Sequence, residues 1–319
     1  MSRPAWFAAL LIGLSLGVAA SPVGAQQKVG LVASFTILAD MAREVGGERV
    51  QVDTLVGPDS DAHVFQPTPA HARAVAQADI LLVNGLGFEG WIDRLQRSSG
   101  FKGQLVVASA GITPLTMEDG HDHGHGHSHG AGSTRKKVKA AKAINDPHAW
   151  QDLANGRTYV DNIARGLAAA DPAGASYYAQ RAGAYKQRLS DLDTRVRAAF
   201  DAIPVAKRRA ITSHDAFGYF GRAYGIEFIP ATGASTESEP TARQIAALIA
   251  QIRKEKIKAL FVENMSNPRL IEQLGRDAGV TPGGALYSDS LSPPGGPADT
   301  YLKMFELNAT TLQAGMARN

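Results

Sequence analysis

Short apolar runs alternate with amphipathic stretches over the first half of the chain. The runs have the length of buried strands, and in the stretches between them apolar residues recur with the three- and four-residue spacing of a helix. Strands that alternate with helices predict a parallel sheet covered by helices. The expected strands are residues 28–35, 50–57, 79–87 and 103–109, and the expected helices are residues 36–47, 69–78 and 91–98.

The same alternation returns in the second half of the chain. The expected strands are residues 208–213, 226–231, 257–263 and 284–288, and the expected helices are residues 216–225, 241–256, 267–279 and 298 to about 316. A chain of 319 residues is long enough for two domains of ordinary size. We therefore predict an α/β fold of two lobes, residues 26–170 and 203–319, each with a parallel β-sheet flanked by helices.

Residues 171–202, between these lobes, have the pattern of one long helix. Asp171 is a candidate N-cap, and Pro172 suits the first helical position. Apolar residues on one face recur at spacings of three, four and seven, namely Tyr178, Tyr185, Leu189, Leu192, Val196 and Phe200. Such a helix is roughly 40 Å long at about 1.5 Å per residue. We interpret it as a rigid link packed along both lobes, with a coiled-coil partner helix as the alternative.

The amino terminus has the pattern of a secretory signal. Arg3 precedes an uncharged apolar run from Ala5 to Ala20, and small residues end at Ala25, so residues 1–25 are expected to be removed as a signal peptide. A membrane anchor is the alternative, but the apolar run is slightly short for a span. The chain has no cysteine, which excludes disulfides, thiolate ligands and a lipid-modified cysteine. We expect a soluble periplasmic protein without a lipid anchor.

A histidine-rich stretch, "GHDHGHGHSHG" at residues 120–130, lies in a polar segment from Thr113 to Ile144 that lacks any periodicity. We expect a mobile loop over residues 113–144. Ordering so many glycines around one ion costs conformational entropy, so a preformed site should bind more tightly. The loop is then an accessory that collects ions, accepts them from a periplasmic donor protein or senses an excess; the alternative is a dispensable insertion.

The charge of the chain gives no sign of nucleic-acid binding. The formal net charge is only +3, and the basic cluster at residues 135–142 has no aromatic residues between its charges. A surface that stacks bases needs such aromatics. We therefore expect no nucleic-acid partner.

Three histidines and one aspartate follow expected strands or lie in loops near them. His63 follows the strand that ends near Val56, His214 follows "AITS", His148 lies in "INDPHAW", and Asp289 follows the last strand. Ligands of open α/β sheets bind outside the carboxyl ends of the strands. Each residue alone is more often structural, and the spacings match no local metal motif. His71, in a predicted helix, is assigned no function.

The motifs around these residues resemble the metal-receptor family of ABC transporters. These solute-binding proteins, periplasmic or lipid-anchored, capture zinc or manganese. The likeness covers nearly the whole chain after residue 25, including the long helix, in the stretches "GPDSDAHVFQPTPAHARAVAQADILLVNGLGFEGW", "NDPHAW", "SHDAFGYFGRAYG", "STESEPTARQIAALIAQIRKEKIKALFVENMSNP" and "LYSDSLS".

The resemblance implies a metal site and a partner. It implies His63, His148, His214 and Asp289 as the metal ligands, with the ion held between two similar lobes. It also implies a monomeric receptor that delivers its ion to an ABC permease in the inner membrane, which is driven by a cytoplasmic ATPase. Histidine-rich insertions at this place are typical of zinc-specific members.

The ligand types favour zinc over manganese. Three imidazoles and one carboxylate suit tetrahedral Zn²⁺, whereas Mn²⁺ prefers more oxygen. Manganese-selective members of the family usually have a glutamate at the position of His214. Asp59 or Asp61 remains open as a further ligand, and Glu263, Glu237 and Glu239 are candidates to orient the imidazoles.

Four protein ligands leave no open position on a four-coordinate zinc ion. Catalytic zinc sites keep one position free for water. We therefore expect a binding protein and no enzyme. The alternatives are a manganese receptor of the same family and, in a different class, a zinc-dependent hydrolase in which Asp289 acts as general base.

Overall fold

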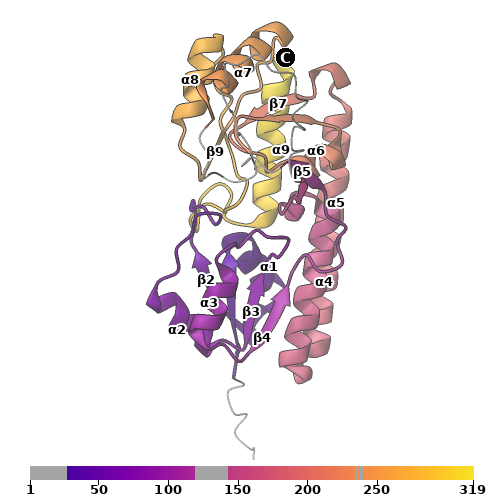
Figure 1. The fold of residues 1–319 in the computed structure, drawn as a ribbon. Coiled ribbons are helices and arrows are strands. Elements are labelled where there is room, and N and C mark those ends of the chain that lie inside the picture. Colours follow the sequence, from indigo (N-terminus) through magenta and orange to yellow (C-terminus); the bar gives the residue numbers. More distant parts are fainter. Residues whose placement is uncertain (1–26, 119–142, 234–235, 237–239) are drawn as a thin grey trace, which may run out of the picture.

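The structure, a computed structural model, describes residues 27–118, 143–233, 236 and 240–319. The described chain forms two α/β lobes that lie one above the other along a long helix (Figure 1). The predicted signal peptide and the histidine-rich stretch at residues 120–130 lie outside the described residues. No helix in the described part is both long and apolar enough to span a bilayer.

The first lobe contains the predicted parallel sheet. Its strand order is β2-β1-β3-β4, with every neighbouring pair parallel. Chain order therefore reverses at β1, and the loops after β1, β2 and β3 leave the same edge of the sheet. The elements are β1 (Val29–Phe35), α1 (Thr36–Gly46), η1 (Gly47–Arg49), β2 (Val50–Val56), α2 (Pro69–Gln77), β3 (Ile80–Val83), α3 (Ile92–Ser99) and β4 (Gln104–Val107).

The second lobe repeats this order with shorter strands. β7 pairs with β8 and β9 pairs with β10, both in parallel. A parallel bridge from Ile211 to Leu260 joins the two pairs, which gives the order β8-β7-β9-β10. The elements are η4 (Val205–Lys207), β7 (Arg209–Thr212), α6 (Gly218–Tyr224), β8 (Glu227–Pro230), α7 (Ala242–Glu255), β9 (Val262–Glu263), α8 (Arg269–Ala278), β10 (Ala285–Leu286) and α9 (Tyr301–Ala317).

The long helix is present as α5 (Ala175–Asp201), after a 3₁₀ turn η3 (Pro172–Gly174). The Asp171 carboxylate accepts a hydrogen bond from the Gly174 backbone at 3.2 Å, as expected of a cap. The predicted apolar face of α5 is buried. α5 packs on α1 of the first lobe and on α6 and α9 of the second. It also packs along a helix that the sequence did not reveal, α4 (Leu153–Ala170).

The prediction of a loop throughout residues 113–144 was wrong at its two ends. Two short strands, β5 (Thr116–Glu118) and β6 (Ala143–Asn145), pair in antiparallel fashion, with Glu118 opposite Ala143. The strands have three residues each, too few to show an alternating pattern. The hairpin brings Glu118 and Ala143 together shortly before the loop that contains His148 and the 3₁₀ turn η2 (Ala149–Gln151).

One apolar core runs through both lobes, and a second lies beneath α7 and α8. Buried polar contacts also join the lobes. The Tyr301 backbone donates to Asp40 Oδ2 at 2.8 Å, and the Leu291 backbone donates to Thr36 Oγ1 at 2.8 Å. A shared core with such contacts holds the two sheet edges in a fixed relation.

Candidate metal centre

The four residues predicted as metal ligands meet between the two lobes. His63, His148, His214 and Asp289 each offer one nitrogen or oxygen atom, and these atoms lie within 4.8 Å of one another. His148, His214 and Asp289 are buried, whereas 9% of the His63 side chain is exposed. His63 follows β2, His214 follows β7 and Asp289 follows β10, and His148 lies in the loop after β6. This agrees with the general placement of ligands at the carboxyl ends of strands in α/β folds.

Asp289 is at the centre of this group. Its Oδ2 lies 3.1 Å from His214 Nε2 and 3.3 Å from His63 Nε2. Its Oδ1 lies 3.8 Å from His148 Nε2 and accepts no hydrogen bond from the described residues. The Nε2 atoms of His63 and His148 are 3.3 Å apart. Three imidazole nitrogens and a carboxylate thus face a common point, the arrangement of a cation site.

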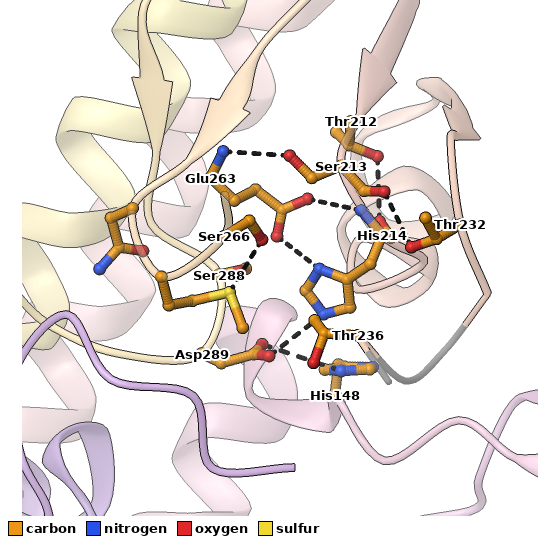
Figure 2. A network of polar contacts seen from close by, with 12 residues as sticks. His148, Thr212, Ser213, His214, Thr232, Thr236, Glu263, Ser266, Ser288 and Asp289 are labelled. Carbon is orange, nitrogen blue, oxygen red and sulfur yellow. Dashed lines mark hydrogen bonds and ion pairs between the residues drawn. The ribbon is translucent and has the colours of Figure 1, made fainter. Parts of the chain in front are cut away.

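A carboxylate holds the far side of the His214 ring (Figure 2). Glu263 Oε2 lies 2.7 Å from His214 Nδ1, and Glu263 Oε1 accepts a hydrogen bond from the His214 backbone at 2.9 Å. The Glu263 backbone in turn lies within hydrogen-bond distance of Ser213 Oγ, at 3.3 Å. Three glutamates were candidates to orient an imidazole, and Glu263 is the one that lies beside the His214 ring. Glu237 and Glu239 lie outside the described residues.

Asp146 has the corresponding position at His148, and sequence reasoning missed it. Asp146 Oδ1 lies 2.8 Å from His148 Nδ1 and accepts from the His148 backbone at 2.9 Å. The same Asp-x-His pattern occurs at His63, whose backbone donates to Asp61 Oδ1 at 2.8 Å. An aspartate two residues before a histidine is the signal that could have identified both turns.

The electrostatics of the centre favour a cation. Burial lowers the pKa of His214, but the carboxylates of Glu263 and Asp289 outweigh it and hold that pKa well above its usual value. Burial raises the pKa of Asp289, but His214 and His148 outweigh it and hold that pKa well below its usual value. The buried carboxylates therefore attract either a proton or a metal ion to the imidazoles.

The remaining predicted candidates have other contacts. Asp59 Oδ1 accepts from Asn264 Nδ2 at 2.8 Å, and the second oxygen of Asp61 accepts from Thr236 Oγ1. Neither belongs to the four-residue group in the described structure. The ring of His71 accepts a hydrogen bond from the Thr68 backbone at 3.0 Å and so helps cap α2.

Comparison with known proteins agrees with this arrangement. Residues 31–315 match the family model described as ZnuA, zinc-uptake complex component A, periplasmic. The chain belongs to this family. It is 30% identical to the metal ABC transporter substrate-binding lipoprotein FimA of Streptococcus parasanguinis, over 98% of this chain and 97% of the relative. It is also 30% identical to the iron-binding protein YfeA of Yersinia pestis, over 93% of this chain and 89% of the relative.

Solved structures show the same fold. The periplasmic zinc-binding protein TroA of Treponema pallidum superposes with a TM-score of 0.79 at 28% identity, over 91% of this chain and 99% of TroA. The manganese-bound periplasmic metal-binding protein of Candidatus Liberibacter asiaticus superposes with a TM-score of 0.75 at 26% identity, over 91% of this chain and all of that one. The predicted two-lobed α/β fold is therefore confirmed.

The family gives the general function. The chain is a substrate-binding protein of a metal ABC transporter, a receptor that works with a membrane permease and its ATPase. Relatives are named for different metals, manganese for PsaA of Streptococcus pneumoniae and iron for YfeA. FimA and PsaA are also named lipoproteins, in contrast to the expectation of no lipid anchor for this chain.

Proposed function

We propose that this protein captures Zn²⁺ with His63, His148, His214 and Asp289 and delivers it to the permease. The observation that carries the proposal is the convergence of three Nε2 atoms and one carboxylate within 4.8 Å, almost closed off from water. Three imidazoles and a carboxylate are a common donor set for zinc, whereas Mn²⁺ favours more oxygen ligands.

The spacing of the donor atoms supports zinc as well. Zn–N and Zn–O bonds of about 2.0–2.1 Å in a tetrahedron put neighbouring donor atoms about 3.3 Å apart. Asp289 Oδ2 lies 3.1 Å from His214 Nε2 and 3.3 Å from His63 Nε2, and the Nε2 atoms of His63 and His148 are 3.3 Å apart. Asp289 Oδ1 and His148 Nε2 are 3.8 Å apart, and all the donor atoms lie within 4.8 Å of one another. Small shifts of the side chains would then suffice to coordinate the ion.

The same count of ligands argues against catalysis. Four protein donors complete a four-coordinate zinc ion, and a hydrolase would need one position for water. The role of Asp289 as a general base, the alternative mechanism, would require it to leave the ion. We therefore propose a receptor in which zinc is cargo.

The cellular setting follows from the sequence. We propose a monomeric, soluble periplasmic protein with a cleaved signal peptide at residues 1–25. The lobes are assigned to residues 26–170 and 203–319, with residues 171–202 as the link. The absence of cysteine in the chain argues against a thioether-linked lipid, although relatives carry the word lipoprotein in their names.

The histidine-rich stretch is proposed as an accessory that gathers zinc or accepts it from a donor protein. The β5–β6 hairpin supports this role, because β6 ends at Asn145, three residues before the proposed ligand His148. The alternative, a dispensable insertion, predicts that a chain without residues 119–131 supports zinc uptake as well as the full chain does when zinc is scarce.

Elemental analysis tests the choice of metal. The protein is purified from its own compartment at native expression, with metal-free buffers, and its metals are measured per chain. We expect close to one zinc per chain, with the same ion preferred in competition against Mn²⁺ and Fe²⁺. Manganese or iron as the predominant metal would contradict the proposal and leave the family assignment intact.

A further inference from the structure

The loop between β3 and α3, residues 84–91, contacts the chain next to both metal ligands of the first lobe. Trp91 Nε1 donates a hydrogen bond to the Ala62 carbonyl at 2.8 Å, one residue before His63. The Phe88 ring packs edge-on against the His63 ring, with 4.8 Å between centroids. The loop thus holds both the backbone and the imidazole of His63.

The other end of the loop holds the segment of His148. Asn84 Nδ2 donates to the Pro147 carbonyl at 2.9 Å, one residue before His148. The Asn84 amide is itself fixed, because its Oδ1 accepts a hydrogen bond from the Tyr159 hydroxyl. Asn84 is completely buried, so water cannot replace its contacts without opening the core.

The loop has an unusual backbone. Gly85, Leu86 and Gly87 all have positive φ, at 85°, 57° and 89°. The Phe88 backbone donates to the Gly85 carbonyl at 3.1 Å, which closes a tight turn. Glycine or asparagine is preferred where φ is positive, and Leu86 is neither. Such conformations persist only where the surroundings enforce them, and they cluster at functional sites.

Glu89 enforces the turn from within the lobe. Its Oε1 accepts hydrogen bonds from the Asn84 backbone and from Ser34 Oγ, both at 2.6 Å, and its Oε2 accepts from the Gly85 backbone at 3.2 Å. The residue is 5% exposed. Burying a carboxylate is unfavourable unless it is fully hydrogen-bonded. Here each of its bonds holds either the start of the loop or β1.

We propose that the 84–91 loop, closed by Glu89, is the positioning element for His63 and His148, with Trp91 and Asn84 as its positioning residues. The inference rests on the proposed metal site. The loop therefore contributes to zinc binding through His63 and His148 alone. It does not act through His214, which Glu263 positions instead.

Double-mutant cycles test this selectivity. Trp91→Phe removes the donor to Ala62 and keeps an aromatic ring, and zinc affinity is measured by chelator competition. We expect Trp91→Phe to weaken binding about tenfold in the otherwise unchanged protein, the lower end of the range for such outer contacts. The same change should have little effect in a His63→Ala protein and its full effect in a His214→Ala protein. Asn84→Ala should also weaken zinc binding in the otherwise unchanged protein. It should have little effect in a His148→Ala protein and its full effect in a His214→Ala protein.

Tyr178→Phe is the matched control, because it also removes one buried donor, to Asp171 at 2.8 Å, but on α5 and away from the ligands. It should leave zinc affinity unchanged. Equal losses for Trp91→Phe in the His63→Ala and His214→Ala proteins, or no loss in the unchanged protein, would overturn the positioning role. If His63→Ala and His214→Ala themselves left zinc affinity unchanged, the proposed metal site would fail instead.

Discussion

Glu263 and His214 are joined twice, once at the ring and once at the backbone. Glu263 Oε2 lies 2.7 Å from His214 Nδ1, and Glu263 Oε1 accepts from the His214 backbone at 2.9 Å. The carboxylate therefore favours a proton on Nδ1 and leaves Nε2, 3.1 Å from Asp289, free for a metal ion. Glu263, at the end of β9, thus fixes the ligand His214, which follows the neighbouring strand β7.

Glu263→Gln is expected to weaken zinc binding by about 10- to 100-fold, the usual effect of losing such an outer carboxylate. The amide keeps the size of the side chain but removes the charge that makes the imidazole more basic. Chelator competition at pH 7.5 measures the change. Glu272→Gln, at an exposed position on α8, is the control and should bind zinc normally. An unchanged affinity for Glu263→Gln would argue against this role.

His214→Glu is expected to reduce the preference for Zn²⁺ over Mn²⁺, because it exchanges a nitrogen donor for oxygen. It also places a third carboxylate between Glu263 and Asp289, so the metal-free protein should be less stable. Adding Glu263→Gln should recover part of that stability. The measurement is the ratio of zinc and manganese dissociation constants for each variant. A ratio that stays the same would show that His214 does not set the preference.

Asp40→Asn is expected to stabilise the metal-free protein at pH 7 but not at pH 4. Burial raises the pKa of Asp40 to about 6, so between pH 4 and 6 the folded state holds a proton that the unfolded state releases. This group's contribution to the free energy of unfolding therefore falls as pH rises, by about 3 kcal/mol in total. Denaturant unfolding at several pH values gives the difference between variant and parent. A difference independent of pH would contradict this assignment, and Asp53→Asn, exposed on β2, is the control.

The sequence predicted the strands and helices of the two lobes because these depend on short-range patterns, whereas the four converging residues were implied by the resemblance to a known family. Apolar runs marked β1 and β3, and the ligands follow strands in loops whose motifs resemble a known family. Asp171 and Pro172 marked the start of the long helix for the same local reason.

The missed features depend on tertiary contacts. Helix α4 contains Asn155 and Gly156, a pair that usually signals a turn. A glycine suits position 156 of this helix because the Tyr301 hydroxyl of α9 lies 2.9 Å from the place a Cβ would occupy. The role of Glu89 is equally invisible in sequence, since its partner Ser34 is 55 residues away.

The most direct test of the central claim is a zinc titration of two variants side by side, one without residues 119–131 and one with His214→Ala. The account predicts that the deletion variant keeps tight binding of one zinc per chain, whereas His214→Ala loses most of its affinity with the histidine-rich stretch intact. Loss of tight binding in the deletion variant, with His214→Ala binding zinc like the unchanged protein, would contradict it.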